Sequence, residues 1–580
     1  MRKRIYLVNL VLVASVILLV SSCISTKLPD SYSVNPEVLE AKGGKVAFTV
    51  NGTIPEKSFH KKAVVEFHPY IQYDGKTQDL KKFVLRGEKT EGEGTVINSK
   101  TGGSFTYNEE FDYSDDMRAS ELWVKATITK GGKVIETDPV KLADGIITTY
   151  RKIIHDEDLS YAPSGYEKVT IVPKKATVYF KVNMANLNFN CKLNKSESAK
   201  AEMDSLDVFL KKGWAIKDVN INAWASPEGE IDFNDDLSDR RAETAQKFIE
   251  KKLKNTSKNR AEVQGTDAGE VDKEVAYNAH GNGEDWDGFM KGVRSSNLKD
   301  KSMILNVVNS QNDASKREQE IRNMTQIYSE IEDEILPPLR RAEIIVNFFE
   351  PKRTDEEIAR LAVTSPDSLT YPELLHAATL TDDHQAKFNI YKEAFTHRHR
   401  DWKTYNNAAA EAINLDNIDE ADNILVQAQK LSSNNGMIEN NLGVVACHRD
   451  DWAKAEKFFT DAQMHGENEN YNLGIVMIQK GEYQKALTYF KGISCRHNVA
   501  LAQVLAGNMN EALKNLKCSP ENPKTYYMLA IYGARTGNDK MVYEYLGKAL
   551  QMHPKCKSKV AEDREFVKYF DNPEFQKVVQ

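Results

Sequence analysis

Hydrophobic and polar residues alternate from residue 45 to about residue 150, which is typical of strands with one buried face. In the stretch ELWVKATITKGGKVIET, four apolar residues share one face: Leu122, Val124, Ala126 and Ile128. The glycine pair at 131–132 supplies the turn. Several short strands joined by glycine turns predict a β-sandwich over residues 45–150. No chemically active side chains cluster in it, so we expect a spacer or a docking surface.

Strand-like and helix-like patterns alternate over residues 169–350, after a linker near 151–168. The stretches ATVYFKV, DVNINAWAS and RRAEIIVNFF have the pattern of strands. Helices are expected over residues 196–212 and 234–254, and a further one over 313–336, where isoleucines recur at helical spacing. This order predicts an α/β sandwich, a sheet covered by helices.

The pattern repeats over residues 372–580. Ala421 aligns with Ala455, a period of 34 residues, and small residues followed by large apolar ones recur in five units. The small residues allow two helices to approach closely. This spacing closely resembles the tetratricopeptide repeat (TPR), which implies an all-α solenoid whose concave groove holds an extended peptide or a protein partner. The alternative is an array that only stiffens the chain.

The first 22 residues have the pattern of a secretory signal. Three basic residues precede an apolar run from Ile5 to Val20, which is short for a membrane span of about 20 residues. Cys23 follows directly after LVSS and resembles the lipobox cysteine of bacterial lipoproteins. The resemblance implies that Cys23 is acylated and that residues 23–44 form a lipidated polar tether. An ordinary signal peptide with an incidental cysteine is the alternative.

Composition narrows the possible functions. Loss of the signal lowers the formal net charge from −7 to −10, which argues against nucleic-acid binding. The remaining five cysteines show no CxxC pairs and no histidines at zinc-site spacing, so we expect no metal, no cofactor and no disulfide framework. The sequence contains neither GxSxG nor HExxH. We therefore expect a protein that is not an enzyme.

The helix expected over residues 234–254 contains two adjacent arginines. With Leu237 at 0°, Arg241 falls at about 40°, inside the apolar arc, and Arg240 at about 300°, outside it. Arg240 can face water. A buried guanidinium keeps its charge, so Arg241 requires an anion or carbonyl groups as hydrogen-bond acceptors.

The residues around Arg241 also resemble a known family. INAWASPEG, followed by Asn234 and then LSDRRA, is similar to the signature of the OmpA-like peptidoglycan-binding domain over about residues 170–350. The resemblance implies that Arg241 binds the carboxylate of diaminopimelate in the peptidoglycan stem peptide. The alternative is that Arg241 pairs with a structural acid such as Glu343 or Asp235.

The turn before this helix departs from the family pattern. Ser226 stands where the family has an aspartate, and Glu228, two residues later, is the candidate substitute. Trp224 is expected to be a cleft wall or a packed aromatic. The predicted ligand-binding set is therefore Trp224, Ser226, Glu228, Asn234 and Arg241.

Two functions fit these patterns. In the first, lipid anchors the chain in the outer membrane on the periplasmic side, the OmpA-like domain binds peptidoglycan, and the TPR groove recruits a protein partner. In the second, the chain is an accessory subunit of an outer-membrane secretion, gliding or uptake complex, and its OmpA-like fold docks a protein without binding the wall.

Overall fold

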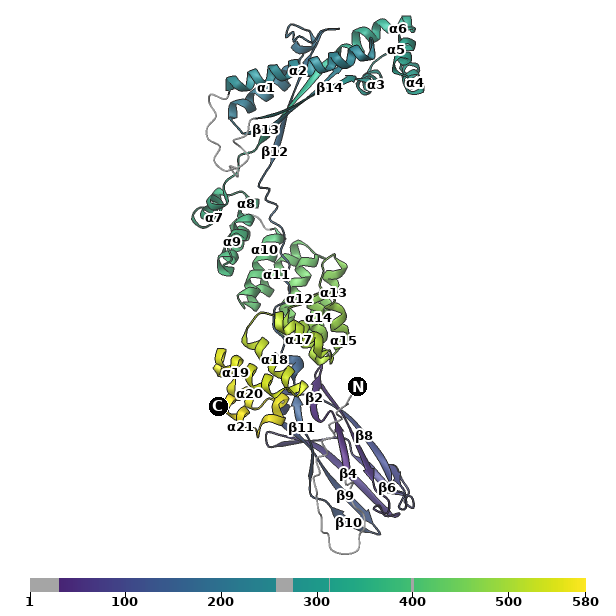
Figure 1. Ribbon diagram of the computed structural model, residues 1–580, viewed down its shortest axis with the longest axis vertical. Helices are drawn as coiled ribbons and strands as arrows, with labels where there is room; N and C mark the ends of the chain where they lie inside the picture. Colours follow the sequence, from purple (N-terminus) through teal and green to yellow (C-terminus); the bar gives the residue numbers. More distant parts are fainter. Residues whose placement is uncertain (1–30, 257–274, 312, 398–400) are drawn as a thin grey trace, which may run out of the picture. The chain divides into compact units, whose positions relative to one another are not determined.

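The computed structural model describes residues 31–256, 275–311, 313–397 and 401–580 (Figure 1). The described residues form two compact units, one from the described part of residues 31–162 with 401–580 and one from the described part of residues 163–397. The predicted signal peptide and lipidated Cys23 lie outside the described residues. Among the helices that are described, none has both the length and the apolar character needed to cross a bilayer.

The N-terminal domain is rich in strands, as predicted, and these strands form one connected sheet. Its path is β1-β3-β2-β11-β9-β4-β6-β7, and β5, β8 and β10 pair with β4, β3 and β9. The hydrophobic core of the domain contains buried residues of β3 and β8 packed against buried residues of β4, β6 and β9. The strands are β1 (Ser31–Asn35), β2 (Val38–Lys42), β3 (Lys45–Ile54), β4 (Ala63–Tyr73), β5 (Lys76–Asp79), β6 (Phe83–Gly87), β7 (Thr95–Ile97), β8 (Gly103–Asp112), β9 (Ser120–Lys130), β10 (Lys133–Glu136) and β11 (Val140–Ile147).

Part of the predicted tether belongs to this domain. Strands β1 and β2 lie within residues 31–42, where the sequence predicted a polar tether. The prediction was wrong for these residues because Leu39 and Ala41, on alternate positions of β2, are fully buried, and β2 pairs with both β3 and β11.

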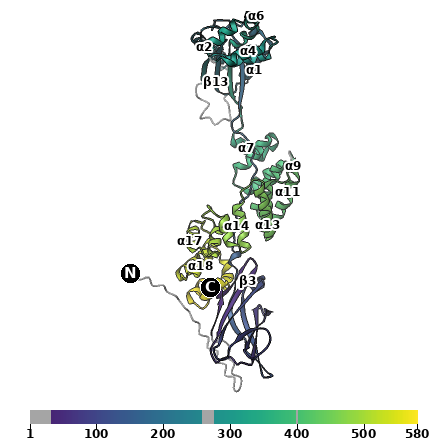
Figure 2. The same cartoon turned by 90° about the vertical axis from the view of Figure 1, so that its right-hand side faces the viewer.

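The five predicted repeat units are five helix pairs in the same compact unit. In Figures 1 and 2, α11, α13, α14, α17 and α18 follow one another through the array. A side chain at Gly443 or Gly474 would overlap the ring of Phe459 or Phe490, which explains the small residues of the repeat. The pairs are α10 (Trp402–Asn414) with α11 (Ile418–Leu431), α12 (Gly436–His448) with α13 (Trp452–Met464), α14 (Asn470–Gln479) with α15 (Tyr483–Tyr489), α16 (His497–Leu505) with α17 (Met509–Cys518), and α18 (Pro523–Thr536) with α19 (Asp539–Met552).

The start of the repeat region needs a correction. The sequence assigned residues 372–399 to the repeats, but α8 (Tyr371–Ala377) and α9 (His384–His397) belong to the other compact unit. They pack together and continue from α7 (Asp355–Thr364). The C-terminal end of the chain adds α20 (Lys557–Ala561) and α21 (Pro573–Val579).

The strand domain docks on the C-terminal repeats. Arg535, at the end of α18, forms an ion pair with Glu40 of β2 at 2.6 Å and a second with Glu565. Glu565 also accepts a hydrogen bond from the Thr149 hydroxyl. Gly43, in the turn after β2, lies so close to the Lys480 carbonyl that a side chain there would clash. These contacts hold the strand domain and the repeats together.

The second unit is built on a four-stranded sheet of order β12-β15-β13-β14, in which β13 and β14 are parallel. Helices α1 and α2 contribute to one core cluster with alternate residues of β12, β13 and β15, so both cover the same face. The elements are β12 (Ile171–Tyr179), α1 (Glu197–Lys212), β13 (Ile216–Ala225), α2 (Ile231–Thr256), β14 (Ala276–Glu284), α3 (Trp286–Ser295), α4 (Lys301–Ser310), α5 (Ala314–Arg322), α6 (Thr325–Glu330) and β15 (Arg341–Phe349).

The long helix predicted over residues 313–336 is interrupted. It divides into α5, α6 and a π-helical turn over Ile331–Ile335. Breaks let Ile321, Ile331 and Ile335 all reach the small core that they share with α3 and α4. One straight helix of this length would spread these side chains over about 20 Å.

Candidate functional site

The groove of the repeat array contains part of the same chain. Residues 152–162 run along it without secondary structure, between the strand domain and the second unit. At four successive repeats an asparagine side chain forms two hydrogen bonds with the backbone of one linker residue. Its carbonyl oxygen accepts from the residue's N–H and its amide donates to the residue's C=O, at 2.8–2.9 Å: Asn407 with Ala162, Asn441 with Ser160, Asn472 with Asp158 and Asn498 with Ile154.

These four asparagines, here called the asparagine ladder, occupy equivalent places in α10, α12, α14 and α16. They are at most 2% exposed. The linker runs antiparallel to the order of the repeats, since Ile154 lies at the fourth and Ala162 at the first. Since the ladder contacts peptide groups, it recognises an extended backbone whatever its side chains.

A second set of buried asparagines supports the ladder. Asn406 and Asn440 precede two ladder residues and donate to the carbonyls of Ser160 and Asp158. Ladder residues also bond to these neighbours: Asn441 donates to Asn406 at 3.0 Å and Asn472 to Asn440 at 2.8 Å. A connected network of this kind fixes the orientation of every amide.

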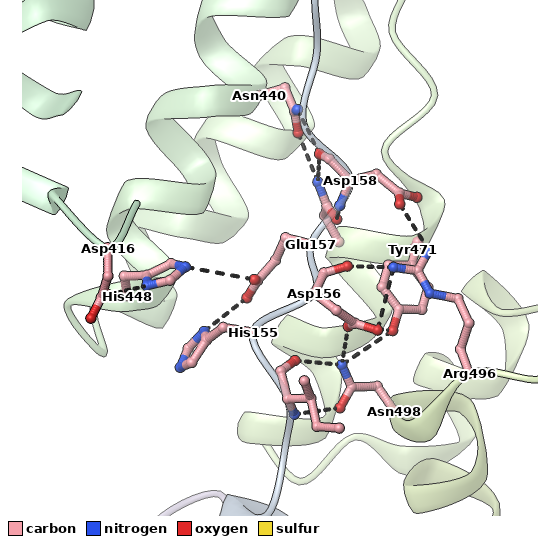
Figure 3. Close-up of polar contacts among 12 residues, drawn as sticks. His155, Asp156, Glu157, Asp158, Asp416, Asn440, His448, Tyr471, Arg496 and Asn498 are labelled. Carbon is pink, nitrogen blue, oxygen red and sulfur yellow. Dashed lines mark hydrogen bonds and ion pairs between the residues drawn. The ribbon is translucent and has the colours of Figure 1, made fainter. Parts of the chain in front are cut away.

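Linker side chains add charged contacts (Figure 3). Arg496 binds the Asp158 carboxylate at 2.8 Å and stacks on the ring of Tyr471. The Tyr471 hydroxyl donates to Asp156 at 2.6 Å, and Asn498 donates to the same carboxylate oxygen at 2.8 Å. Burial raises the pKa of Asp156, while Tyr471 and Arg496 act in the opposite direction. These contacts fix the register that the backbone bonds alone leave open.

The start of the linker is held as well. Gln479 donates to the Tyr150 carbonyl at 2.6 Å, and the Nε2 atom of His497 lies 2.8 Å from the Lys152 carbonyl. Burial lowers the pKa of His497 to about 4, so the ring is neutral at neutral pH and donates from Nε2.

The prediction about the groove therefore needs a correction. The groove does hold an extended peptide, but the occupant is the linker of this chain, where the sequence predicted a separate protein partner. The reason is covalent: the linker is attached at both ends, so its effective concentration at the groove exceeds that of a free peptide.

A titratable group beside the ladder gives a pH-dependent prediction. Burial, and then the charge of Glu467, raise the pKa of Glu469 to about 8, although Asn472 donates to this carboxylate at 3.0 Å. The folded chain therefore binds this proton more tightly than the unfolded chain. Protonation of Glu469 therefore stabilises the folded state. This contribution to the free energy of unfolding is complete below the ordinary pKa of about 4.5 and is lost as the pH rises to about 8.

We expect Glu469→Gln to reduce the change in the free energy of unfolding between about pH 4.5 and pH 8. Above pH 8 the variant should be more stable than the wild type by on the order of 2 kcal/mol, because glutamine stays neutral and can still accept from Asn472. Urea unfolding between pH 5 and pH 9 measures the difference. Glu511→Gln, at an exposed position of α17, is the control, and an unchanged profile in Glu469→Gln would contradict the assignment.

The second unit contains the predicted arginine site. Arg241 lies on the buried side of α2 and is 1% exposed, and Arg240 is exposed, as the helical positions predicted. Arg240 also pairs with Asp236. The Arg241 guanidinium donates to three backbone carbonyls: Met184 at 3.1 Å, Trp224 at 2.9 Å and Lys181 at 3.1 Å. Burial, and then the charge of Arg340, lower the pKa of Arg241 to about 10.

The other predicted residues gather around the same end of β13. Ser226 donates to Glu228 at 2.6 Å, and Arg340 pairs with Glu228 at 2.6 Å, with both charged groups largely buried. Asn234 donates to Glu284 at 2.8 Å. The guanidinium of Arg341 lies over the Trp224 ring, with its central carbon 4.4 Å from the centroid of the ring.

The structure thus brings the five predicted residues together, and the polar side chains of Ser226, Glu228, Asn234 and Arg241 have partners within the chain. This contradicts the prediction that Arg241 is free to bind an external carboxylate. Its acceptors are carbonyls, and neither Glu343 nor Asp235 is the partner. Glu343 instead pairs with Arg341 and Lys175. Glu228, the proposed substitute for the family aspartate, is neutralised by Arg340.

The cysteines also differ from the prediction. Cys495 and Cys518 form a disulfide between the start of the fourth repeat and the end of α17, with a Cα–Cα distance of 4.9 Å. Sequence spacing gave no sign of it because the two cysteines meet only when α16 and α17 pack as a pair. Cys191, Cys447 and Cys556 are free thiols.

Comparison with known proteins gives fold similarities and no family. No known protein family and no curated protein matches the sequence. A tetratricopeptide repeat protein from Parabacteroides merdae is 13% identical, with a TM-score of 0.29, and the match covers 36% of this chain and 90% of that one. PilW, a type IV pilus biogenesis factor, is 17% identical (TM-score 0.28; 39% and 98% covered). YrrB, a TPR protein with an unusual peptide-binding site, is 20% identical (TM-score 0.23; 28% and 92% covered). The helix pairs of residues 402–552, with the close helix contacts at Gly443 and Gly474, are TPR-like repeats.

Proposed function

We propose that the chain is a non-enzymatic scaffold protein, an accessory subunit of an outer-membrane secretion, gliding or uptake assembly. The observation that supports it most is the asparagine ladder. By holding the linker in the groove, the ladder joins the strand domain and the repeats into one body. A groove filled in this way serves as a structural joint, and the outer surfaces of the repeats and the strand domain are left for partners.

The middle domain, similar to OmpA-like domains in its signature, docks a protein in this proposal and does not bind the wall. Arg241 and Glu228, the groups that would bind diaminopimelate, both have internal partners. An incoming carboxylate would have to displace carbonyls from a guanidinium that is 1% exposed.

Anchoring follows from the N-terminal segment. The signal-like residues 1–22 and the lipobox-like Cys23 support export and acylation, which would place the protein on the periplasmic face of the outer membrane. The disulfide between Cys495 and Cys518 supports export too, since such bonds persist mainly in oxidising compartments.

Sedimentation with purified peptidoglycan tests the choice between docking and wall binding. The full-length chain in detergent should pellet no more with peptidoglycan than without it, and free diaminopimelate should change nothing. Pelleting that diaminopimelate abolishes would instead support the wall-binding function. Competition avoids substitutions at Arg241, which are expected to destabilise the domain.

A further inference from the structure

Three potential metal ligands meet where the linker passes the second repeat (Figure 3). His155 and Glu157 lie on the linker, and His448 is the last residue of α12. His155 Nδ1 is 3.1 Å from Glu157 Oε1, and His448 Nε2 is 3.9 Å from Glu157 Oε2. One ligand atom from each residue lies within 4.8 Å of the other two. The imidazole rings are 4.4 Å apart between centroids.

The carboxylate of Glu157 is buried without a permanent cation. Its side chain is 1% exposed, and within the described parts of the chain its ion-pair partners are these two histidines. Carboxylates this deeply buried are normally paired with lysine or arginine or bound to a metal. Histidine carries no permanent charge, whereas a bound metal ion would supply a fixed positive charge beside this carboxylate.

The ligand set and its surroundings match zinc. Two imidazole nitrogens and one carboxylate oxygen are ligands that Zn²⁺ takes at about 2.0–2.2 Å, which separates tetrahedral ligand atoms by about 3.3 Å. The two histidine–carboxylate distances, 3.1 and 3.9 Å, lie on either side of this value, and all three ligand atoms lie within 4.8 Å of one another. His155 is exposed, so water can reach the fourth position.

We propose that His155, Glu157 and His448 bind one divalent transition-metal ion, best matched by Zn²⁺, and that the ion fastens the linker to the second repeat. This revises the expectation of no metal site. The site could not be predicted from the sequence, because His155 and Glu157 lie far from His448 in the chain. The three residues meet only when the linker lies in the groove. The ion would thereby make retention of the linker dependent on metal supply. The site is independent of membrane anchoring and of wall binding.

Zinc titration of the full-length chain, purified in detergent and stripped with EDTA, tests the proposal. Calorimetry should show one Zn²⁺ per chain with a Kd of about 1 μM or tighter. Saturation should raise the Tm of the unit that contains the repeats by roughly 3–6 °C and slow hydrogen exchange in residues 152–162. Co²⁺ in place of Zn²⁺ should give a visible d–d absorption band.

Two variants remove the site without disturbing the repeat core. His448→Ala and His155→Asn should each weaken zinc binding at least 10-fold and abolish the Tm shift. His465→Ala is the matched control, since His465 also pairs with a glutamate, Glu439, at 2.6 Å in the same array. Absence of zinc uptake by the wild type, or uptake that survives both His155 and His448 substitutions, would overturn the proposal.

Discussion

Replacing Asn441 and Asn472 together by alanine should release the linker from the groove and destabilise the repeat-containing unit by about 4–6 kcal/mol. Each side chain binds both the N–H and the C=O of a linker residue, Ser160 or Asp158. A buried peptide group left unpaired costs about 1–3 kcal/mol. The linker can lower that cost by moving into water, so exposure of residues 152–162 should precede global unfolding.

Limited proteolysis and urea unfolding measure this effect. The double variant should be cleaved within residues 152–162 under conditions that leave the wild type intact. Asn470→Ala is the matched control, because Asn470 lies on the same helix as Asn472 and is exposed. Equal protection of the linker in the double variant and the wild type would show that the ladder does not hold it.

Arg241→Ala should destabilise the second unit by about 3–5 kcal/mol. The substitution leaves the carbonyls of Lys181, Met184 and Trp224 without their donor and opens a cavity beside Phe180, whose ring faces the guanidinium. Removing the buried charge of the guanidinium recovers some free energy, but less than the lost hydrogen bonds and the cavity cost. Hydrogen exchange in β13 and β15 reports the free energy of opening in this unit alone.

Arg240→Ala is the natural control for this prediction. Arg240 is adjacent in sequence but exposed, and its pair with Asp236 is a surface i,i+4 pair worth about 0.3–0.5 kcal/mol. If the two variants were equally stable, Arg241 would not have the structural role assigned to it, and a role in ligand binding would again explain its burial.

The repeats could be predicted from the sequence because their signal is local and recurs. Gly443 and Gly474 lie at close helix contacts in equivalent positions of two repeats. The periodic pattern of small residues can still be recognised in the fourth unit, which is shorter. The sequence also contains a signal of the ladder that was not used in the predictions above: Asn441 and Asn472 each come directly before a Leu-Gly pair. A recurrent asparagine at a buried position of a repeat indicates backbone recognition.

The occupant of the groove could not be predicted in this way. Residues 152–162 have no periodic pattern, and the asparagines that hold their backbone lie 245–344 residues away in the chain. Strand β14 was missed for a related reason. It lies at the edge of its sheet with alternating glycine and polar residues, and pairing with β13 gives it order that its own sequence does not encode.

For Arg241, the helix geometry predicted the burial but not the partners. Its place beside Leu237 on the apolar side of α2 follows from residue spacing alone. Two of its three acceptors come from the turn after β12, at Lys181 and Met184, which is distant in sequence and lies beside α2 only in the folded sheet. The family resemblance indicated an external anion where the chain supplies its own carbonyls.

Hydrogen exchange of the linker in the wild-type chain tests the central claim most directly. If the asparagine ladder holds the linker, the amides of Ile154, Asp158, Ser160 and Ala162 should exchange about 100- to 1000-fold more slowly than in an unstructured peptide of the same sequence. Exchange of these four amides at the unstructured rate would mean that the groove is open in solution, and it would contradict the account.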